Sequence, residues 1–168
     1  DDGSTDNTLK KLKEKAKLDN RIRVLFNRKN KGIGETVNKL LDNVKTDYYT
    51  QLDGDDHYLP DMDKMQNELT GEDIIYFDWK FKSGKIRKLT KENYKNFSGC
   101  NRFVKMKAIG ELRTAGERVD EDQLFYKNFL KKNPSTKFTG LVAYYRNYPR
   151  KGSLCDLKNK SFIFAAKL

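Results

Sequence analysis

The chain has 168 residues, a length that suits one domain with a single hydrophobic core. Aromatic residues make up 12% of the chain, with ten Phe and nine Tyr, and this content argues against intrinsic disorder. The 35 Lys and Arg residues against 24 Asp and Glu give a formal charge of +11. That charge fits an anionic partner such as a nucleic acid, an acidic membrane or a phosphate-bearing ligand, and it fits a lysine-rich soluble surface equally well.

The first third of the chain alternates loops, helices and strands. Residues 1–7 (DDGSTDN) read as a loop that leads into a helix, and residues 21–27 (RIRVLFN) predict a strand. Between residues 33 and 44 apolar side chains recur at helical spacing, which predicts an amphipathic helix. Residues 48–52 (YYTQL) predict the next strand, which leads directly into the acidic segment 53–56 (DGDD). This order predicts an α/β fold whose mostly parallel sheet is flanked by helices.

The second half extends the same pattern, so we interpret residues 1–168 as a single domain. It predicts a short helix from Pro60, strands at 73–82 and 85–89 joined by a hairpin turn, helices at 101–113 and 121–131, and a last strand at 137–146. The loop at Asp1 and Asp2 would ordinarily follow a strand. We therefore expect that an upstream strand–helix–strand segment is missing and that the fold is incomplete at its N-terminus.

Three carboxylates, on Asp53, Asp55 and Asp56, lie within four residues directly after a predicted strand. Carboxylates this close repel one another unless a cation or solvent offsets their charge. Mg²⁺ and Mn²⁺ prefer oxygen ligands and typically take one or two carboxylates together with substrate phosphates. From the residues alone, a metal site and a solvated acidic turn remain open alternatives.

The spacing of residues in this chain does not match other known motifs that bind metals or phosphates. In a calcium-binding EF-hand loop counted from Asp53, the sixth position would be Gly and the twelfth Glu, but here they are Tyr58 and Lys64. The chain contains no P-loop motif. His57 is the single histidine, which leaves little basis for a zinc site or a Ser-His-Asp triad.

A second acidic pair, Glu121-Asp122, begins a predicted helix. Carboxylates favour helix N-termini because of the helix dipole, and this structural reading comes first. A carboxylate at such a position is also suited to accept a proton from an attacking hydroxyl group.

Several separated segments together resemble glycosyltransferase family 2, whose members are inverting enzymes of GT-A fold. The segments are the loop 1–8 (DDGSTDNT), Asn30-Lys31-Gly32 with Asn38, the segment 52–56 (LDGDD) followed by Pro60, and Glu121-Asp122 with Leu124. The resemblance covers about residues 1–125. It implies a GT-A fold in which roughly residues 1–80 bind the nucleotide sugar and roughly 81–168 bind the acceptor.

The resemblance also implies roles for individual residues. Asp1, Asp2, Lys31 and Asp53 would bind the nucleotide, Asp55 and Asp56 would bind Mn²⁺ or Mg²⁺, and Asp122 would be the catalytic base. Arg146, Arg150 and Lys151 would belong to a loop over the diphosphate, although solvated surface charge explains them equally well. Val37 stands where the family often carries arginine, so this contribution to donor binding has no counterpart here.

The function that this resemblance implies is metal-dependent, inverting transfer of a sugar. The donor would be a nucleoside diphosphate, expected to be UDP, and the acceptor a saccharide or lipid-linked molecule in the synthesis of cell-surface polysaccharide. Two alternatives are a sugar-nucleotide nucleotidyltransferase, which shares an acidic metal loop, and a basic nucleic-acid-binding domain, which rests on the charge of +11. A nucleic-acid-binding domain would not explain the acidic clusters, so we expect no nucleic-acid partner.

Cysteine content and hydropathy bear on where the protein is found. Cys100 and Cys155 are too few for a disulfide framework, which favours a reducing cytoplasm. No apolar run approaches the roughly 18 residues of a membrane span. The basic surface suggests, as a hypothesis, peripheral contact with an anionic membrane.

Overall fold

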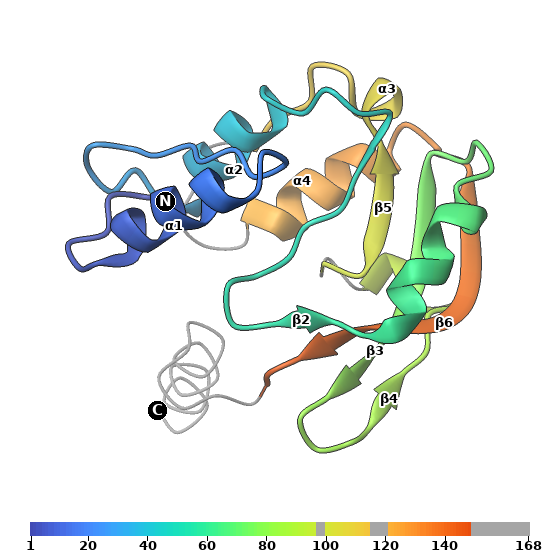
Figure 1. Cartoon of the computed structure of the whole chain (residues 1–168). Helices are drawn as coiled ribbons and strands as arrows, with labels where there is room; N and C mark the ends of the chain where they lie inside the picture. Colours follow the sequence, from blue (N-terminus) through green and yellow to red (C-terminus); the bar gives the residue numbers. More distant parts are fainter. Residues whose placement is uncertain (97–99, 115–120, 149–168) are drawn as a thin grey trace, which may run out of the picture.

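The computed structural model describes residues 1–96, 100–114 and 121–148, and at residues 96, 121 and 122 it describes the backbone alone. In chain order its elements are α1 (Thr8–Leu18), α2 (Ile33–Leu41), β1 (Tyr48–Tyr49), β2 (His57–Tyr58), the 3-10 helix η1 (Pro60–Glu68), β3 (Ile74–Phe81), β4 (Ile86–Arg87), the 3-10 turn η2 (Tyr94–Asn96), β5 (Arg102–Lys105), α3 (Met106–Ile109), α4 (Glu121–Leu130) and β6 (Thr136–Arg146). Figure 1 shows the strands gathered on one side of the molecule and α1 and α2 on the other.

One curled sheet holds the described strands together, in the order β1-β5-β3-β6-β2, with β4 also paired to β3. The long strand β3 is central because it pairs with β5 and β4 along one edge and with β6 along the other. Its burial explains its position. Six consecutive residues from Ile74 are buried, as expected for a strand covered on both faces.

The α/β class is as predicted, but the pairing is less parallel than the alternation of elements suggested. Among the described strands, β3 and β6 pair parallel and the other pairs are antiparallel. A tight turn such as the one between β3 and β4 can join only antiparallel strands, whereas the connection from β3 to β6 includes α4 and permits the parallel arrangement. Local sequence patterns do not determine which strands become neighbours.

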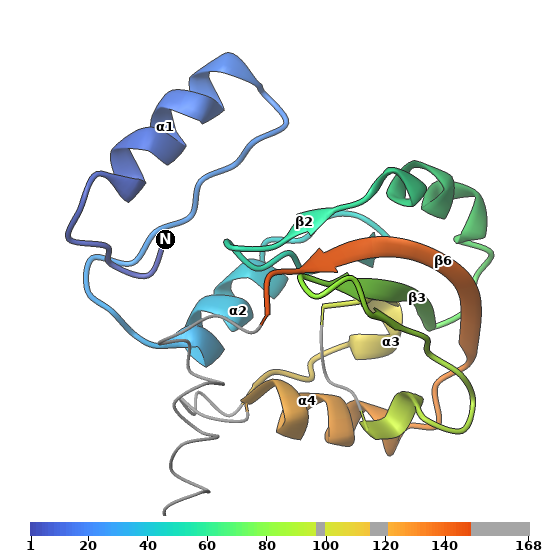
Figure 2. The same ribbon diagram turned by 90° about the horizontal axis from the view of Figure 1, so that it is seen from below.

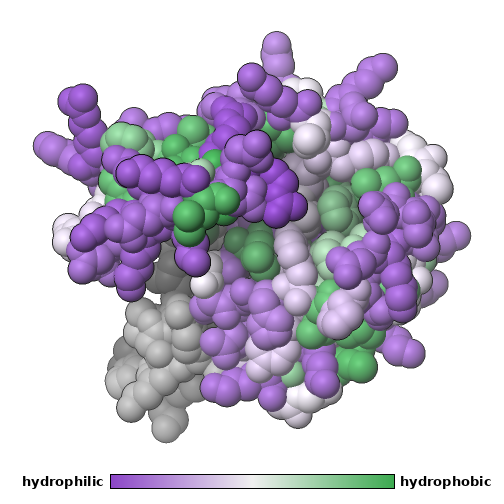
Figure 3. All heavy atoms as spheres, viewed as in Figure 1, coloured by the Kyte–Doolittle hydropathy of each residue, from purple (hydrophilic) through white to green (hydrophobic). Residues whose placement is uncertain are grey.

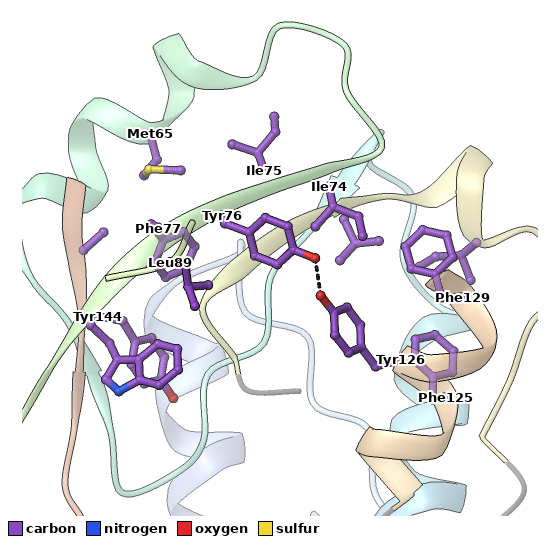
Figure 4. Packing of buried hydrophobic residues seen from close by; sticks show 14 of the residues in the cluster. Met65, Ile74, Ile75, Tyr76, Phe77, Leu89, Phe125, Tyr126, Phe129 and Tyr144 are labelled. Atoms are coloured by element: carbon purple, nitrogen blue, oxygen red, sulfur yellow. Dashed lines mark hydrogen bonds between the residues drawn. The ribbon is translucent and has the colours of Figure 1, made fainter. Parts of the chain in front are cut away.

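The core lies between β3 and the elements on its two faces. Figure 4 shows Tyr76 of β3 and Tyr126 of α4 pointing toward each other, and their hydroxyl groups are hydrogen-bonded. Phe129 of α4 lies on the same side as Tyr126, whereas Met65 of η1 lies on the opposite side of β3. All four side chains are buried, so α4 and η1 are each held against the sheet by large apolar groups.

Two predicted elements differ in the structure. Residues 22–27 form no strand. Their backbone bonds with the first loop consist of the Asp1 amino group donating to Leu25 O and Asn27 N–H donating to Asp1 O, which is too few for a regular ladder. Residues 101–113, predicted as a helix, form β5 followed by the short α3. Pairing of β5 with both β1 and β3 overrides the helical propensity of this segment.

The amino-terminal helix is peripheral. Figure 2 shows α1 standing beside the part of the chain that carries the sheet, and α1 buries none of its residues. Hydrophilic side chains cover most of the face in Figure 3, including the region over α1. In the described part of the chain, no helix combines the length and the apolar character needed to cross a bilayer.

Candidate functional site

The acidic segment 53–56 forms a turn between β1 and β2 (Figure 1). The predicted strand 48–52 is regular only at Tyr48–Tyr49, so the chain is already irregular where it enters this turn. The N–H of Asp56 donates to the carbonyl of Asp53 at 3.1 Å and closes the turn. This backbone bond brings the first and last carboxylates of the segment onto one short loop.

Asp53 is held by two side chains from different parts of the chain. Its Oδ1 accepts hydrogen bonds from Gln51 Nε2 at 3.1 Å and from Cys100 Sγ at 3.3 Å. Cys100 lies just before β5, 47 residues away in the sequence. The acidic turn is therefore attached to the segment that leads into β5.

Asp56 is held by β6 and the residues after it. The Tyr144 hydroxyl donates to Asp56 Oδ2 and the N–H of Asn147 donates to Asp56 Oδ1, each at 2.7 Å. Asp55 is exposed between these two anchored neighbours. Asp53 and Asp56 are half-buried, so Asp55 is the most solvent-accessible residue of the three.

Burial keeps the Cys100 thiol and the Tyr144 hydroxyl protonated. It raises the pKa of the Cys100 thiol, and the negative charge of Asp53 raises it further. Burial likewise raises the pKa of the Tyr144 hydroxyl, with smaller contributions from nearby Cys100 and from the hydrogen bond to Asp56. At neutral pH both groups therefore act as hydrogen-bond donors to the acidic turn.

Replacing Tyr144 by phenylalanine is expected to loosen this turn. The change removes one donor from Asp56 and leaves the ring in place, so we expect a loss of about 1–2 kcal/mol in the free energy of unfolding. Urea denaturation of the variant measures the effect. Tyr145→Phe is the matched control, because Tyr145 stacks its ring on His57 and that contact needs no hydroxyl. Equal stability of the Tyr144→Phe variant and the unsubstituted chain would contradict the anchoring role.

Asp2 organises a second loop by accepting three hydrogen bonds. Asn27 Nδ2 and the N–H of Lys31 donate to its Oδ1, both at 2.9 Å, and the N–H of Gly32 donates to its Oδ2 at 2.8 Å. Gly32 has a φ of 91° and immediately precedes α2, where the positive φ favours glycine. Asp2 therefore fixes the turn from which α2 begins.

The hydrogen bonds also set the charge state of Asp2. Partial burial tends to raise the pKa of its carboxyl group, but the bonds from Asn27, Lys31 and Gly32 outweigh this and hold the pKa below its ordinary value. Asp2 is consequently ionised at neutral pH. Its neighbour Asp1 accepts a bond from the N–H of Ser4 at 2.8 Å, which shapes the same loop.

Gly3 is required where this loop meets residues 29 and 30. Its φ is +74°, and an added Cβ would lie 2.7 Å from Asn30 N and 2.7 Å from the carbonyl carbon of Lys29. Both atoms are backbone atoms, so neither can rotate away.

Gly3→Ala is therefore expected to undock the first loop from residues 29–32. Loop opening should become easier by about 1–3 kcal/mol, and the amide protons of Lys31 and Gly32 should exchange roughly 10- to 100-fold faster. Hydrogen exchange followed by NMR measures this directly. Gly54→Ala is the control, since a Cβ at Gly54 meets no atom within 4 Å. Unchanged exchange at both amides in Gly3→Ala would show that the loop tolerates a side chain.

A pocket of about 110 Å³ brings distant parts of the chain to the acidic turn. Asp53 and Asp56 line it together with Ile33 and Val37 of α2 and Phe125 of α4. Asp2 acts on this pocket indirectly, by fixing the turn before α2. The volume exceeds that of a single water several-fold, so the pocket has room for part of a ligand.

The structure places the other predicted site residues as follows. Arg146 lines the same pocket, and its guanidinium lies 5.7 Å from the ring centre of Tyr148. Asp122 lies in the first turn of α4, one turn before Phe125, and its side chain lies outside what the structure describes. Arg150 and Lys151 also lie outside the described residues. Lys31 contributes its backbone N–H to Asp2, as given above.

No group of three or more His, Cys, Asp or Glu side chains in residues 1–96, 100–114 and 121–148 is arranged to hold a metal ion by itself. An ion that takes one or two carboxylates and completes its shell with ligand oxygens needs no such group. The donor set of the acidic turn fits Mg²⁺ or Mn²⁺ in this manner, with Asp55 as the exposed carboxylate.

Sequence patterns did not indicate the residues that hold the turn. Cys100 and Tyr144 carry no motif around them, and their role follows from contacts over 47 and 88 residues. Asn27 is a buried amide at the end of the predicted strand 21–27, and it donates a hydrogen bond to Asp2. A polar residue at the end of such a strand is a sequence signal that could have pointed to this contact. Asn38 belongs to the segments that carry the family resemblance. Its side-chain amide donates to the carbonyl of Thr114 and accepts from the N–H of Thr114.

The model of the family described as Glycosyl transferase family 2 matches residues 1–115. The chain belongs to this family. The matched range includes the loop around Asp2, the start of α2 and the acidic turn. A search of curated proteins finds no match to the chain.

Solved structures support the fold of this family 2 chain. Three similar structures are of residues 1–349 of S. aureus TarS. The structure without a named ligand has 19% sequence identity to this chain and a TM-score of 0.72. The complex with UDP has 22% identity and a TM-score of 0.69, and the complex with UDP-GlcNAc has 20% identity and a TM-score of 0.75. The matches cover 88%, 88% and 91% of this chain and 49% of each TarS chain. The chain thus spans about half the length of these structures, and the likeness shows a shared fold.

Proposed function

We propose that this chain is the GT-A domain of an inverting glycosyltransferase that moves a sugar from a nucleoside diphosphate to a saccharide or lipid-linked acceptor. The observation that carries the proposal is the pocket in which Asp53 and Asp56 of the acidic turn meet the start of α2 and Phe125 of α4. Membership of glycosyl transferase family 2 supports the reaction class. The TarS structures with UDP and UDP-GlcNAc support a uridine nucleotide as the donor.

In this proposal the first 80 residues or so bind the nucleotide and the remainder binds the acceptor. Asp1, Asp2, Lys31 and Asp53 form the nucleotide side. The docking of the Asp2 loop onto the N–H groups of Lys31 and Gly32 supports this, because it fixes the turn before α2 and through α2 the pocket wall.

Asp55 would hold a divalent cation, Mn²⁺ or Mg²⁺, with Asp56 beside it. Such an ion offsets the charge of the diphosphate leaving group. The chain's own contribution is to hold Asp53 and Asp56 on either side of Asp55 against the mutual repulsion of the carboxylates. Cys100 and Tyr144 accomplish this by donating hydrogen bonds to Asp53 and Asp56.

Asp122 would take the proton from the acceptor hydroxyl as that oxygen attacks the anomeric carbon of the sugar. Its place in the first turn of α4, one turn before the pocket residue Phe125, supports this role. Arg146, which also lines the pocket, would face the diphosphate together with Arg150 and Lys151.

A thermal-shift screen tests the proposal. The chain is heated with UDP, UDP-glucose, UDP-galactose and UDP-GlcNAc, each with Mn²⁺ or with EDTA. We expect stabilisation by the nucleotides that depends on Mn²⁺. Absence of stabilisation by every nucleotide in the presence of Mn²⁺ would contradict the proposed function.

We further place the enzyme in the cytoplasm, in peripheral contact with a membrane, acting in cell-surface polysaccharide synthesis. The basic residues of the exposed helix α1, such as Lys10, Lys13 and Lys17, support an anionic contact surface. Co-flotation with liposomes tests this contact. Equal binding to neutral and anionic vesicles would count against it.

A further inference from the structure

Two polar atoms are left over in the wall of the pocket. Within the described ranges, Asn101 Oδ1 and Thr114 Oγ1 are buried and have no hydrogen-bond partner, and both residues line the pocket beside Asp53. Asn101 is 1% exposed and Thr114 is 8% exposed. A buried polar group without a partner is costly, so its presence at a pocket wall calls for an explanation.

The hydrogen bonds between Asn101 and β3 use the side-chain nitrogen of Asn101 and leave its side-chain oxygen, Oδ1, without a partner among the described residues. Its Nδ2 donates to the carbonyl of Phe77 at 3.1 Å, and its own carbonyl accepts from the N–H of Phe77 at 3.1 Å. Because the Phe77 carbonyl needs a donor, the amide must turn its nitrogen toward β3. The same orientation fixes Oδ1 on the other side of the amide group.

Thr114 is held from α2 in a corresponding way. Asn38 Oδ1 accepts from the N–H of Thr114 at 2.8 Å, and Asn38 Nδ2 donates to the Thr114 carbonyl at 3.0 Å. Arg113 reinforces the attachment through a salt bridge of 2.7 Å to Asp42. The backbone of Thr114 is therefore fully occupied by α2, and its hydroxyl is the polar group that remains.

We propose that Asn101 Oδ1 and Thr114 Oγ1 determine specificity for the transferred sugar. Asn101 Oδ1 accepts a hydrogen bond from a sugar hydroxyl, and the Thr114 hydroxyl donates a hydrogen bond to a sugar hydroxyl or accepts one from it. This rests on the proposed function and goes beyond it by naming the groups that recognise the sugar. An amide oxygen can only accept, so its partner must be a donor such as a sugar hydroxyl.

The chemistry of the amide oxygen favours a sugar over the diphosphate at this wall. A phosphate oxygen accepts hydrogen bonds and so cannot pair with Asn101 Oδ1, whereas a sugar hydroxyl can donate to it. The lining itself carries charges of both signs, on Asp53 and Asp56 and on Arg102 and Arg146. Trp79 and Phe125 also line the pocket, and apolar aromatic lining around a few polar groups is usual for a small-molecule site.

The test compares the unsubstituted chain with Thr114→Val and Thr114→Ser. Valine keeps the shape of threonine and removes the hydroxyl, whereas serine keeps the hydroxyl and removes a methyl group. Calorimetric titration with Mn²⁺ measures the affinity for UDP and for whichever of UDP-glucose, UDP-galactose and UDP-GlcNAc binds most tightly. We expect Thr114→Val to bind the UDP-sugar about fivefold more weakly with unchanged affinity for UDP, and Thr114→Ser to bind as the unsubstituted chain does.

Analogues of that UDP-sugar, with one hydroxyl at a time replaced by fluorine, identify the partner. Fluorine at the recognised position should weaken binding to the unsubstituted chain and make no further difference in Thr114→Val. Equal UDP-sugar affinity of Thr114→Val and the unsubstituted chain would overturn the inference. So would an equal loss for UDP and the UDP-sugar. If the unsubstituted chain binds no nucleotide at all, the proposed function itself fails.

Discussion

Asp55→Ala is expected to abolish Mn²⁺-dependent binding of UDP. Asp55 is the exposed carboxylate of the acidic turn, between Asp53 and Asp56, whose oxygens accept hydrogen bonds from elsewhere in the chain. Removing it takes away the proposed protein ligand of the cation and with it the offset of the diphosphate charge. We expect the affinity to fall by a factor of about 100, or roughly 2.8 kcal/mol.

Titration of UDP with Mn²⁺ and with EDTA separates this effect from general damage. In EDTA the variant and the unsubstituted chain should bind equally weakly, because neither then has the cation. Asp63→Ala is the matched control, since Asp63 is an exposed aspartate in the first turn of η1. Undiminished Mn²⁺-dependent binding by Asp55→Ala would show that Asp55 is not the metal ligand.

Asp122→Asn is expected to remove turnover and preserve donor binding. Asparagine has the size of aspartate but cannot take up the proton of an attacking hydroxyl group or water. We expect the rate to fall by about 10²- to 10⁴-fold, with little change in the affinity for the UDP-sugar. Release of UDP from the UDP-sugar, with water as the acceptor, measures the rate without knowledge of the natural acceptor.

Glu121→Gln provides the comparison for this variant. It removes a carboxylate from the same helix turn, so an effect of the helix dipole would appear in both variants. A base assigned to Asp122 predicts a large loss in Asp122→Asn alone. Full turnover by that variant, or equal losses in both, would exclude Asp122 as the base.

Local periodicity predicted the elements whose faces are fixed by their own residues. The helical spacing of apolar residues from Ile33 onward corresponds to α2, and the apolar run after Asp73 corresponds to β3. These predictions succeeded because burial of a stripe or a strand depends on residues that are close in sequence. Residues 101–113 resisted such a prediction, because β5 exists through its pairing with strands from elsewhere.

By itself, the sequence determined the chemistry available to this protein: an acidic turn of three aspartates after a strand, an Asp-Asp-Gly loop before a helix, and the family to which these motifs belong. Only the tertiary structure decided how those groups are held. Cys100 and Tyr144 reach the acidic turn across 47 and 88 residues, and Asn38 reaches Thr114 across 76. Such contacts are set by strand order and packing, which no local pattern encodes, because the energy that fixes them belongs to pairs of segments and not to either segment alone.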